Sequence, residues 1–264
     1  MLKKLLGASQ PLVFGHRGAA GLAPENTLPS FALALSLGVD VLELDVHGTR
    51  DGVIVVHHDA TLERTTNGSG EIRAHDYADL QVLDAGFQYT RDGSDFPYRG
   101  HGLWIPTLEE VLDAFPDVAI NMEVKQAEPA IAAEVVRVIR DLGAADRVLL
   151  AAEKDPIIEE VRGVADGIPT SFAAGEVVDF VNRLTTGDFA GYAPAGTALQ
   201  IPPRFGDIEL VTAASVAAAH EQGLEVHVWT INDRADMDAL LALGIDGIMS
   251  DLPGLARMAV DSLA

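Results

Sequence analysis

Several ionisable residues of this chain stand directly at the ends of short apolar segments, where a strand that only packs would have no use for them. His16 and Arg17 follow the apolar run Leu12–Gly15, and the segment INMEVK contains Glu123 and Lys125. An imidazole can take up and release a proton near neutral pH. An arginine fork and a lysine point charge both suit a phosphate group. These residue types therefore indicate acid–base chemistry on an anionic substrate.

A second group of ionisable residues lies in the stretch VLELDVHGTRDGVIVVHHD, residues 41–59. Its Asp-Gly pair stands between two β-rich runs and predicts a hairpin. With that pair at the centre of a two-residue turn, Asp45 lies opposite His58, and Glu43 shares the strand face of Asp45. A three-residue loop would shift this register by one residue. We therefore expect two carboxylates and an imidazole on one surface.

The polar face of this hairpin has an alternative interpretation, because antiparallel ribbons are often half exposed to solvent. Leu42, Leu44 and Val46 make the other face apolar, so Glu43 and Asp45 must meet either solvent or a cleft. The ionisable residues at the other strand ends favour a cleft. In a parallel barrel, all strand ends converge on the carboxyl-terminal face, where barrel enzymes carry out their chemistry.

The carboxylates would offer a divalent cation hard oxygen ligands. Glu43, Asp45 and Glu123 form this set, and the chain has no cysteine. Oxygen ligands without thiolates favour Mg²⁺ or Ca²⁺ over Zn²⁺. One such cation, an arginine, a lysine and two histidines together are typical of a site that cleaves a phosphoester.

The elements that must position these residues alternate between short apolar strands and capped or amphipathic helices. This alternation predicts an α/β fold, a TIM-type (β/α)₈ barrel, with a doubly wound sheet as the weaker alternative. The antiparallel return strand Val53–His57 extends the barrel, and residues of about 60–106 form an insertion within one domain spanning 1–264. The expected strands are Leu12–Gly15, Val39–Val46, Val118–Val124, Val148–Ala151, Thr170–Ala173, Ala198–Ile201, Val226–Thr230 and Gly247–Met249. The expected helices are 26–37, 107–115, Glu128–Leu142, Asp155–Ala165, Val211–Gln222 and Asp233–Leu243.

Composition excludes several classes of partner. The 264 residues carry a net charge of −22, so the field of the protein opposes nucleic acid and anionic membranes. No segment approaches the roughly 20 apolar residues of a membrane span. The start MLKKLLGASQP has too few apolar residues for a signal peptide. We expect a cytoplasmic protein with a small-molecule substrate and no stable membrane association.

The motifs HRG, PENT, ELDVHGTRDGVIVVHHDATLERTTNG, NMEVK, VHVWTIND and DGIMSD occur in this order from residue 14 to about residue 253. Together they closely resemble the glycerophosphodiester phosphodiesterase family. The resemblance implies a TIM-type barrel and metal-dependent hydrolysis of glycerophosphodiesters to sn-glycerol 3-phosphate and an alcohol. It implies that His16 and His58 are the catalytic histidines and that Glu43, Asp45 and Glu123 bind the metal. It also implies that Arg17 and Lys125 bind the phosphate and that Trp229 forms a wall of the pocket.

Other residues have weaker assignments. Gln200 ends a further expected strand and is a candidate substrate contact. Glu25 would contact the metal or a catalytic histidine without being a principal ligand, and Asn26 would cap the following helix. His57 points to the strand face opposite His58, so we expect a structural role for it.

Two mechanisms and two rival functions stay open. The glycerol 2-hydroxyl could attack phosphorus with one histidine as base and the other as acid, or water could attack directly. A lysophospholipase D-like or phosphoinositide-type phosphodiesterase would need an apolar ridge at the barrel mouth. A barrel that only binds a phosphorylated metabolite would not need every site residue. The residues of the insertion that could form such a ridge are few: Phe87, Tyr89, Phe96, Tyr98, Leu103 and Trp104.

Overall fold

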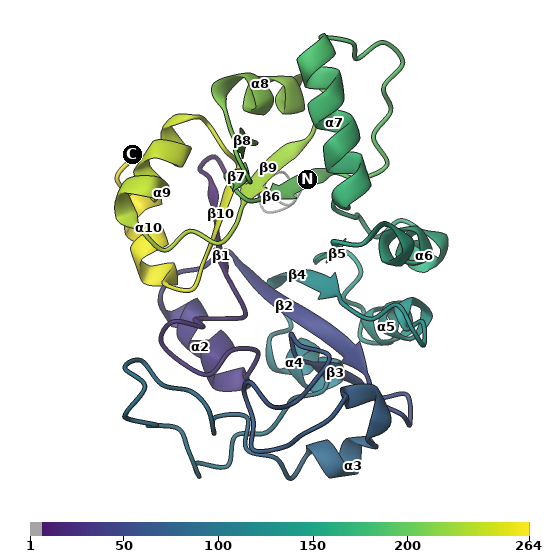
Figure 1. Cartoon of the computed structure of the whole chain (residues 1–264), viewed down its shortest axis with the longest axis vertical. Helices are drawn as coiled ribbons and strands as arrows, with labels where there is room; N and C mark the ends of the chain where they lie inside the picture. Colours follow the sequence, from purple (N-terminus) through teal and green to yellow (C-terminus); the bar gives the residue numbers. More distant parts are fainter. Residues whose placement is uncertain (1–6, 264) are drawn as a thin grey trace.

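Parallel strands form a curled sheet in the order β5-β4-β2-β1-β10-β9-β6 in this computed structural model, which describes residues 7–263 (Figure 1). The strands are β1 (Leu12–Gly15), β2 (Val41–Gly48), β4 (Ala119–Val124), β5 (Val148–Ala151), β6 (Ala198–Ile201), β9 (Glu225–Val228) and β10 (Gly247–Ser250). They match seven of the eight expected barrel strands within a few residues. The residues Met1–Leu6, on which the signal-peptide expectation partly depends, lie outside the described chain.

The edge strands β5 and β6 are joined through a very short eighth segment. Thr170 bridges to Leu150 of β5, and Ser171 bridges to Ala198 of β6. The Ser171 N–H donates to the Leu150 carbonyl at 2.8 Å, and the Phe172 N–H donates to the Ala198 carbonyl at 3.0 Å. The expected strand Thr170–Ala173 is therefore reduced to two bridging residues, which close the sheet. The predicted TIM-type barrel is confirmed.

Helices surround the barrel. All six expected helices are present, although the helix expected to begin at Glu128 begins at Ala132. The sequence analysis missed the helices at Tyr77, Ala174 and Pro253. The helices are α2 (Leu28–Ser36), α3 (Tyr77–Leu80), α4 (Leu108–Ala114), α5 (Ala132–Asp141), α6 (Asp155–Ala165), α7 (Ala174–Thr186), α8 (Ala213–Glu221), α9 (Arg234–Ala242) and α10 (Pro253–Asp261). No helix within residues 7–263 is long and apolar enough to cross a bilayer.

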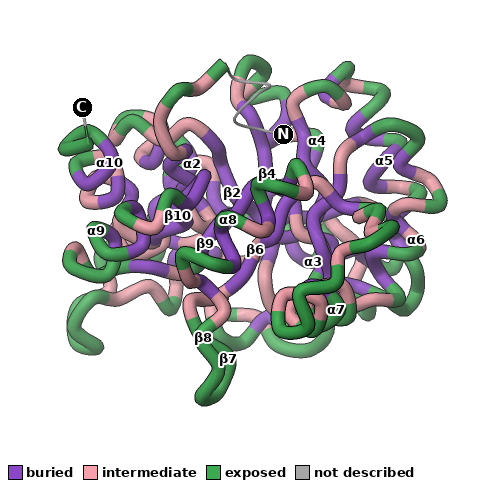
Figure 2. Tube along the Cα trace, turned by 90° about the horizontal axis from the view of Figure 1, so that it is seen from above, coloured by how far each residue is buried: buried purple, intermediate pink, exposed green. Residues whose placement is uncertain are grey.

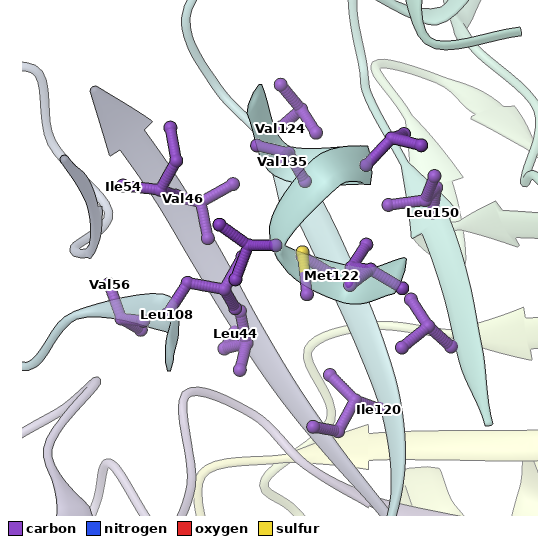
Figure 3. Packing of buried hydrophobic residues seen from close by; sticks show 14 of the residues in the cluster. Leu44, Val46, Ile54, Val56, Leu108, Ile120, Met122, Val124, Val135 and Leu150 are labelled. Carbon is purple, nitrogen blue, oxygen red and sulfur yellow. The ribbon is translucent and has the colours of Figure 1, made fainter. Parts of the chain in front are cut away.

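The alternation along β2 separates packing from chemistry. Leu44 and Val46 point outward and pack with Ile120 and Met122 of the neighbouring strand under the helices (Figure 3). The residues between them point into the barrel, as the period of two along a strand requires. The lower barrel interior is apolar, and it is filled by Leu12, Phe14, Val41, Ala119, Leu149, Ala198 and Met249. The polar interior positions of β2 therefore lie above an apolar floor, near the carboxyl end of the barrel.

The hairpin after β2 is present, but its predicted register is wrong by one residue. Strand β3 (Ile54–Val56) pairs with β2 so that Val46 faces Val56. The Thr49 N–H donates to the Val53 carbonyl at 3.0 Å, which leaves a three-residue loop ending at Gly52 with φ +83°. Asp45 therefore faces His57, whose N–H donates to the Asp45 carbonyl at 2.9 Å, rather than His58.

Two segments extend outward from the barrel. The insertion that follows β3 contains a short 3₁₀ helix (Ile72–Ala74) and α3, and it has its own buried cluster around Leu62 and Leu80. The second segment is a small antiparallel hairpin, β7 (Arg204–Phe205) and β8 (Ile208–Glu209), which the sequence analysis missed. Figure 2 shows this hairpin as an exposed projection from the buried barrel strands.

Candidate active site

The predicted site residues gather around one cavity of about 500 Å³ at the carboxyl end of the barrel. Eight of the nine line the cavity: His16, Arg17, Glu43, His58, Glu123, Lys125, Gln200 and Trp229. The ninth, Asp45, is buried and lies within ion-pair distance of Arg17 and Lys125. The cleft interpretation of the polar hairpin face is therefore confirmed.

A tight turn after β1 places His16 and Arg17. Arg17 has φ +49° and Gly18 has φ +87°, both in the left-handed region. A side chain at Gly15 would put its Cβ 2.6 Å from the Gly18 carbonyl oxygen, so the chain can reverse here only with glycine. The Arg17 N–H donates to Glu43 Oε2 at 2.8 Å, which ties the turn to β2. A non-glycine residue held at positive φ is a strained feature of the kind that clusters at functional sites.

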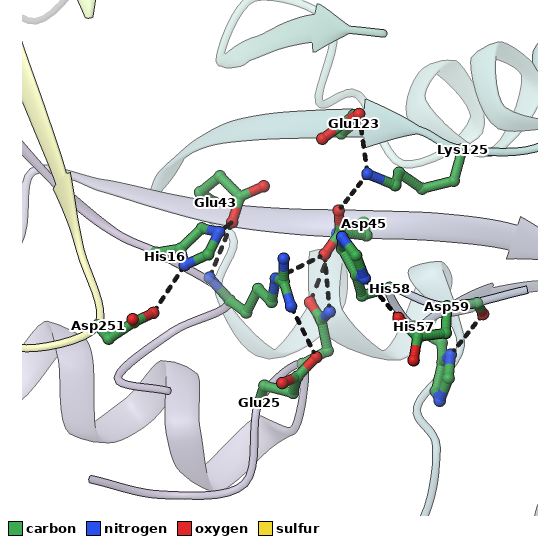
Figure 4. A network of polar contacts seen from close by, with 12 residues as sticks. His16, Glu25, Glu43, Asp45, His57, His58, Asp59, Glu123, Lys125 and Asp251 are labelled. Atoms are coloured by element: carbon green, nitrogen blue, oxygen red, sulfur yellow. Dashed lines mark hydrogen bonds and ion pairs between the residues drawn. The ribbon is translucent and has the colours of Figure 1, made fainter. Parts of the chain in front are cut away.

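Each of the two site histidines has an aspartate on its Nδ1. His16 Nδ1 lies 2.7 Å from Asp251 Oδ1, and His58 Nδ1 lies 2.6 Å from Asp59 Oδ1 (Figure 4). An aspartate in this position fixes the ring tautomer and leaves Nε2 for the substrate. Both histidines line the cavity, so each can present Nε2 to a bound molecule.

The sequence analysis assigned no role to either aspartate. Asp59 directly follows His58, and Asp251 ends the motif DGIMSD. Asp251 follows β10, which pairs with β1, so the first and last barrel strands bring it to His16. The predicted barrel could have indicated the contact between Asp251 and His16, because the first and last strands of a closed barrel are neighbours.

The surroundings of His16 stabilise its protonated form. Burial opposes protonation, but the hydrogen bond with Asp251 and the charge of Glu43 outweigh it and raise the pKa of His16. His16 Nε2 lies 4.0 Å from Glu43 Oε2.

Three carboxylates form a candidate cation site. Glu43, Asp45 and Glu123 each offer an oxygen, and these oxygens all lie within 4.8 Å of one another. Burial and the neighbouring Asp45 raise the pKa of Glu43 to about 7, so this carboxylate lacks sufficient positive charge around it. Burial also opposes ionisation of Asp45, but Arg17 and Lys125 outweigh it and lower the pKa of Asp45. A hard-oxygen cluster with an under-compensated charge fits Mg²⁺ or Ca²⁺.

Arg17 and Lys125 are only partly available to a substrate. Arg17 Nη1 donates to Glu25 Oε1 at 3.0 Å, and its buried Nε has no hydrogen-bond partner but lies 3.4 Å from Asp45 Oδ2. Lys125 Nζ donates to Glu123 Oε1 at 3.0 Å. Both cations therefore already balance carboxylates, while each still lines the cavity.

Two neighbouring residues, Asn26 and His57, had expected structural roles, and the structure differs from expectation for Asn26. Asn26 donates to Asp45 Oδ2 at 2.9 Å and does not cap α2; the cap is Thr27, which accepts from the Ser30 N–H. His57 is buried, with its ring nitrogens hydrogen bonded to the Asp59 carbonyl and the Thr65 hydroxyl, as its expected structural role requires.

Gln200 lies at the cavity wall with its amide already oriented. Its Nε2 donates to Asn121 Oδ1 at 2.8 Å and to His227 Nδ1 at 3.3 Å. His227 Nε2 is 3.1 Å from Glu225 Oε2, and this contact leaves Nδ1 as the acceptor. Gln200 can therefore offer its Oε1 as a hydrogen-bond acceptor to a ligand.

A model of the glycerophosphoryl diester phosphodiesterase family matches residues 16–255. The chain belongs to this family. The resemblance inferred from the motifs is therefore confirmed, and this phosphodiesterase has similar relatives over nearly its whole length. A glycerophosphodiester phosphodiesterase of Caldanaerobacter subterraneus subsp. tengcongensis is 30% identical, and the match covers 92% of this chain and 94% of that protein.

Solved structures agree with the barrel. The glycerophosphoryl diester phosphodiesterase domain of a Mycobacterium tuberculosis protein has a TM-score of 0.85 at 24% identity, covering 95% of this chain and 99% of that one, and this likeness shows the fold alone. An Oleispira antarctica phosphodiesterase, solved in complex with its product sn-glycerol-3-phosphate, has a TM-score of 0.77 at 29% identity, covering 96% and 97% of the two chains.

Proposed function

We propose that this phosphodiesterase hydrolyses glycerophosphodiesters to sn-glycerol 3-phosphate and an alcohol, with one divalent cation. The observation that carries the proposal is the placement of two His–Asp pairs and three carboxylates on one cavity. A phosphodiester held there would have a proton donor or acceptor in each histidine.

The carboxylates Glu43, Asp45 and Glu123 would hold the cation, either Mg²⁺ or Ca²⁺. When bound, it would supply positive charge to the phosphorus oxygens as negative charge develops on them. Arg17 and Lys125 would add donors to the same oxygens, and the carboxylates beside them keep both side chains in place.

The histidines divide the proton transfers. One Nε2 accepts the proton of the attacking hydroxyl, which is either the glycerol 2-hydroxyl or water, and the other donates a proton to the departing alcohol. Asp251 and Asp59 would act as positioning residues, because each holds the ring and stabilises the imidazolium that forms. Gln200 and Trp229 would contact the glycerol or the alcohol.

A barrel that only binds a phosphorylated metabolite is the rival from another class. A binding site has no need for an aspartate on the Nδ1 of each histidine, since that arrangement prepares the ring for proton transfer. The two pairs therefore support an enzyme over a binding protein.

The test is to incubate the protein with glycerophosphocholine and glycerophosphoethanolamine, after EDTA and after adding back Mg²⁺ or Ca²⁺, and to measure glycerol 3-phosphate. We expect product only with cation. His16→Ala should lower kcat by about 100-fold or more, while the matched control His101→Ala, exposed on the insertion, should be unaffected. The proposal fails if no cation yields product. Cation-independent binding of the diesters without hydrolysis would support the rival.

A further inference from the structure

The cavity continues well beyond the ionisable residues. One side of it runs between α7 and the β7–β8 hairpin, and we call this part the apolar arm. Six of its lining residues define it: Val177, Val178, Val181, Phe205, Ile208 and Trp229. None of these six side chains is charged, although the protein has 40 acidic residues.

The apolar arm is exposed to water. Phe205 is 74% exposed, Val178 60%, Ile208 56% and Trp229 37%. These four are half of the eight large hydrophobic residues that are exposed in the described chain, and all four line this one cavity. Single exposed apolar residues need no explanation, but a contiguous group of them marks a binding surface.

The elements that carry the apolar arm contribute little to the protein core. Phe180 is the only buried residue of α7, although the helix has 13 residues. In the hairpin, Phe205 pairs directly with Ile208, so their side chains share one face. An ion pair between Arg204 and Glu209, at 2.8 Å, joins the strands beside them. Figure 2 shows the hairpin projecting from the molecule, with α7 on the same side of the barrel.

We propose that the apolar arm binds the aliphatic chain of the substrate, so that this phosphodiesterase acts on single-chain, lysophospholipid-type glycerophosphodiesters. The inference rests on the proposed function. Its main argument is continuity, because the arm and the two site histidines line the same cavity. A diester of glycerol with a small polar alcohol would reach Trp229 and leave the rest of the arm in contact with water, whereas an acyl chain would cover it.

The chemistry is the proposed hydrolysis on a larger substrate. The bond between phosphorus and the head-group alcohol breaks, and water supplies a hydroxyl to phosphorus and a proton to the alcohol. The products are 1-acyl-sn-glycerol 3-phosphate and the free alcohol. A chain on the first glycerol carbon leaves the 2-hydroxyl free, so both routes of attack remain open.

The insertion carries too few apolar residues for the ridge that a lysophospholipid-type substrate would need. The structure places the exposed apolar residues elsewhere, on α7 and on the hairpin between β6 and α8. Neither element was expected from the sequence, and their residues favour the lysophospholipid alternative.

A chain-length series tests the proposal. The probes are glycerophosphocholine and its 1-acyl derivatives with six, eight and ten carbons, each kept below the concentration at which it forms micelles. We expect kcat/KM to rise by up to about fourfold for each added methylene, as burial of a CH₂ group predicts, until the arm is filled.

Variants connect that rise to the arm. Phe205→Ser/Ile208→Ser and Val178→Ser replace exposed side chains, so they should fold normally. Each should lower the ratio of kcat/KM for the ten-carbon substrate to that for glycerophosphocholine, the double variant by about tenfold or more. The matched control is Val82→Ser, since Val82 is 80% exposed on the insertion, away from the cavity. It should leave the ratio unchanged.

Each outcome separates the two proposals. If glycerophosphocholine is cleaved and chain length has no effect, the apolar arm proposal is overturned and the proposed function stands. A chain-length effect that the arm variants do not change also overturns it. A gain seen only on zwitterionic vesicles, and not on monomers, would make the hairpin a lipid-surface contact and overturn the chain site. If no diester of any length is cleaved, the proposed function itself has failed.

Discussion

His16 Nδ1 and Asp251 Oδ1 lie 2.7 Å apart although 235 residues separate them in sequence. The contact joins the turn after the first barrel strand to the residue that follows the last one. Asp251 also accepts a hydrogen bond from Asn232 Nδ2 at 2.7 Å, which holds its carboxylate in place. The orientation of His16 therefore depends on both ends of the barrel.

Asp251→Asn should lower kcat by about 100-fold or more, because an amide cannot stabilise the imidazolium and no longer fixes the tautomer. KM should change little, since Asp251 is not among the residues that line the cavity. Steady-state kinetics with glycerophosphocholine measures both constants. Asp238→Asn, on the exposed face of α9, is the control. A kcat close to that of the wild type would contradict the role assigned to Asp251.

The consecutive histidines should respond differently to the same substitution. His58→Ala removes a cavity-lining imidazole, so kcat should fall by about 100-fold or more with little change in Tm. His57→Ala leaves the Thr65 hydroxyl and the Asp59 carbonyl without their buried partner, so Tm should fall by about 4–8 °C. Calorimetry and kinetics on the two variants separate the roles. Equal Tm values and equal rates would show that the assignment is wrong.

The carboxylate cluster predicts stabilisation by cation. A ligand that binds only the folded state at about 100 times its Kd adds about 2.7 kcal/mol, so Mg²⁺ or Ca²⁺ should raise the Tm of EDTA-treated protein by about 5–10 °C. Glu43→Gln should abolish that rise. It should not lower the Tm without cation, because it removes one of two adjacent buried negative charges. Differential scanning calorimetry gives the result, and an equal rise in the variant would contradict the proposed ligand.

Arg64 should make stability depend on pH. It donates to Glu25 Oε2 at 2.7 Å and to Asp59 Oδ2 at 2.6 Å. Burial opposes ionisation of both carboxyl groups, but the Arg64 hydrogen bonds outweigh it and lower the pKa of both. A carboxyl group whose pKa is lowered in the folded state stabilises the protein at pH values above its unfolded-state pKa, which is about 4. This stabilisation is lost as the pH falls from about 4 toward the lowered folded-state pKa.

Arg64→Gln should therefore cost about 1 kcal/mol in the free energy of unfolding at pH 7, a modest value because Arg64 is half exposed. The difference from wild type should shrink when both are unfolded in urea at pH 3. Arg137→Gln, which breaks only exposed ion pairs on α5, should cost a few tenths of a kcal/mol at most. A difference for Arg64→Gln that is as large at pH 3 as at pH 7 would contradict this account.

The sequence predicts the barrel and most of the site because strand periodicity and strand ends are local signals. The inward direction of Glu43 follows from the alternation along one strand, and this prediction holds. The position of His58 relative to Asp45 depended on a turn length that an Asp-Gly pair does not determine uniquely. The register was wrong, yet His58 still lines the cavity because β3 ends at Val56 and releases the chain from strict alternation.

The missed features depend on contacts between distant segments. Helix α7 is an exception, because Val177, Phe180, Val181 and Leu184 recur at helical spacing and could have predicted it, although only Phe180 is buried. Strands β7 and β8 have two residues each, too few to show a period. The Asp251–His16 pair requires knowledge of which strands are neighbours, and no local pattern supplies it.

The pairing of β1 with β10, in register from Leu12 with Gly247 to Gly15 with Ser250, has a consequence for biosynthesis. Ribosomes release the amino-terminal part of a chain first, so β1 waits with one edge open until the final strand has been made. During that time His16 has no carboxylate to orient it. Because Asp251 directly follows β10, the docking of the last strand both joins β1 to β9 and brings His16 its aspartate.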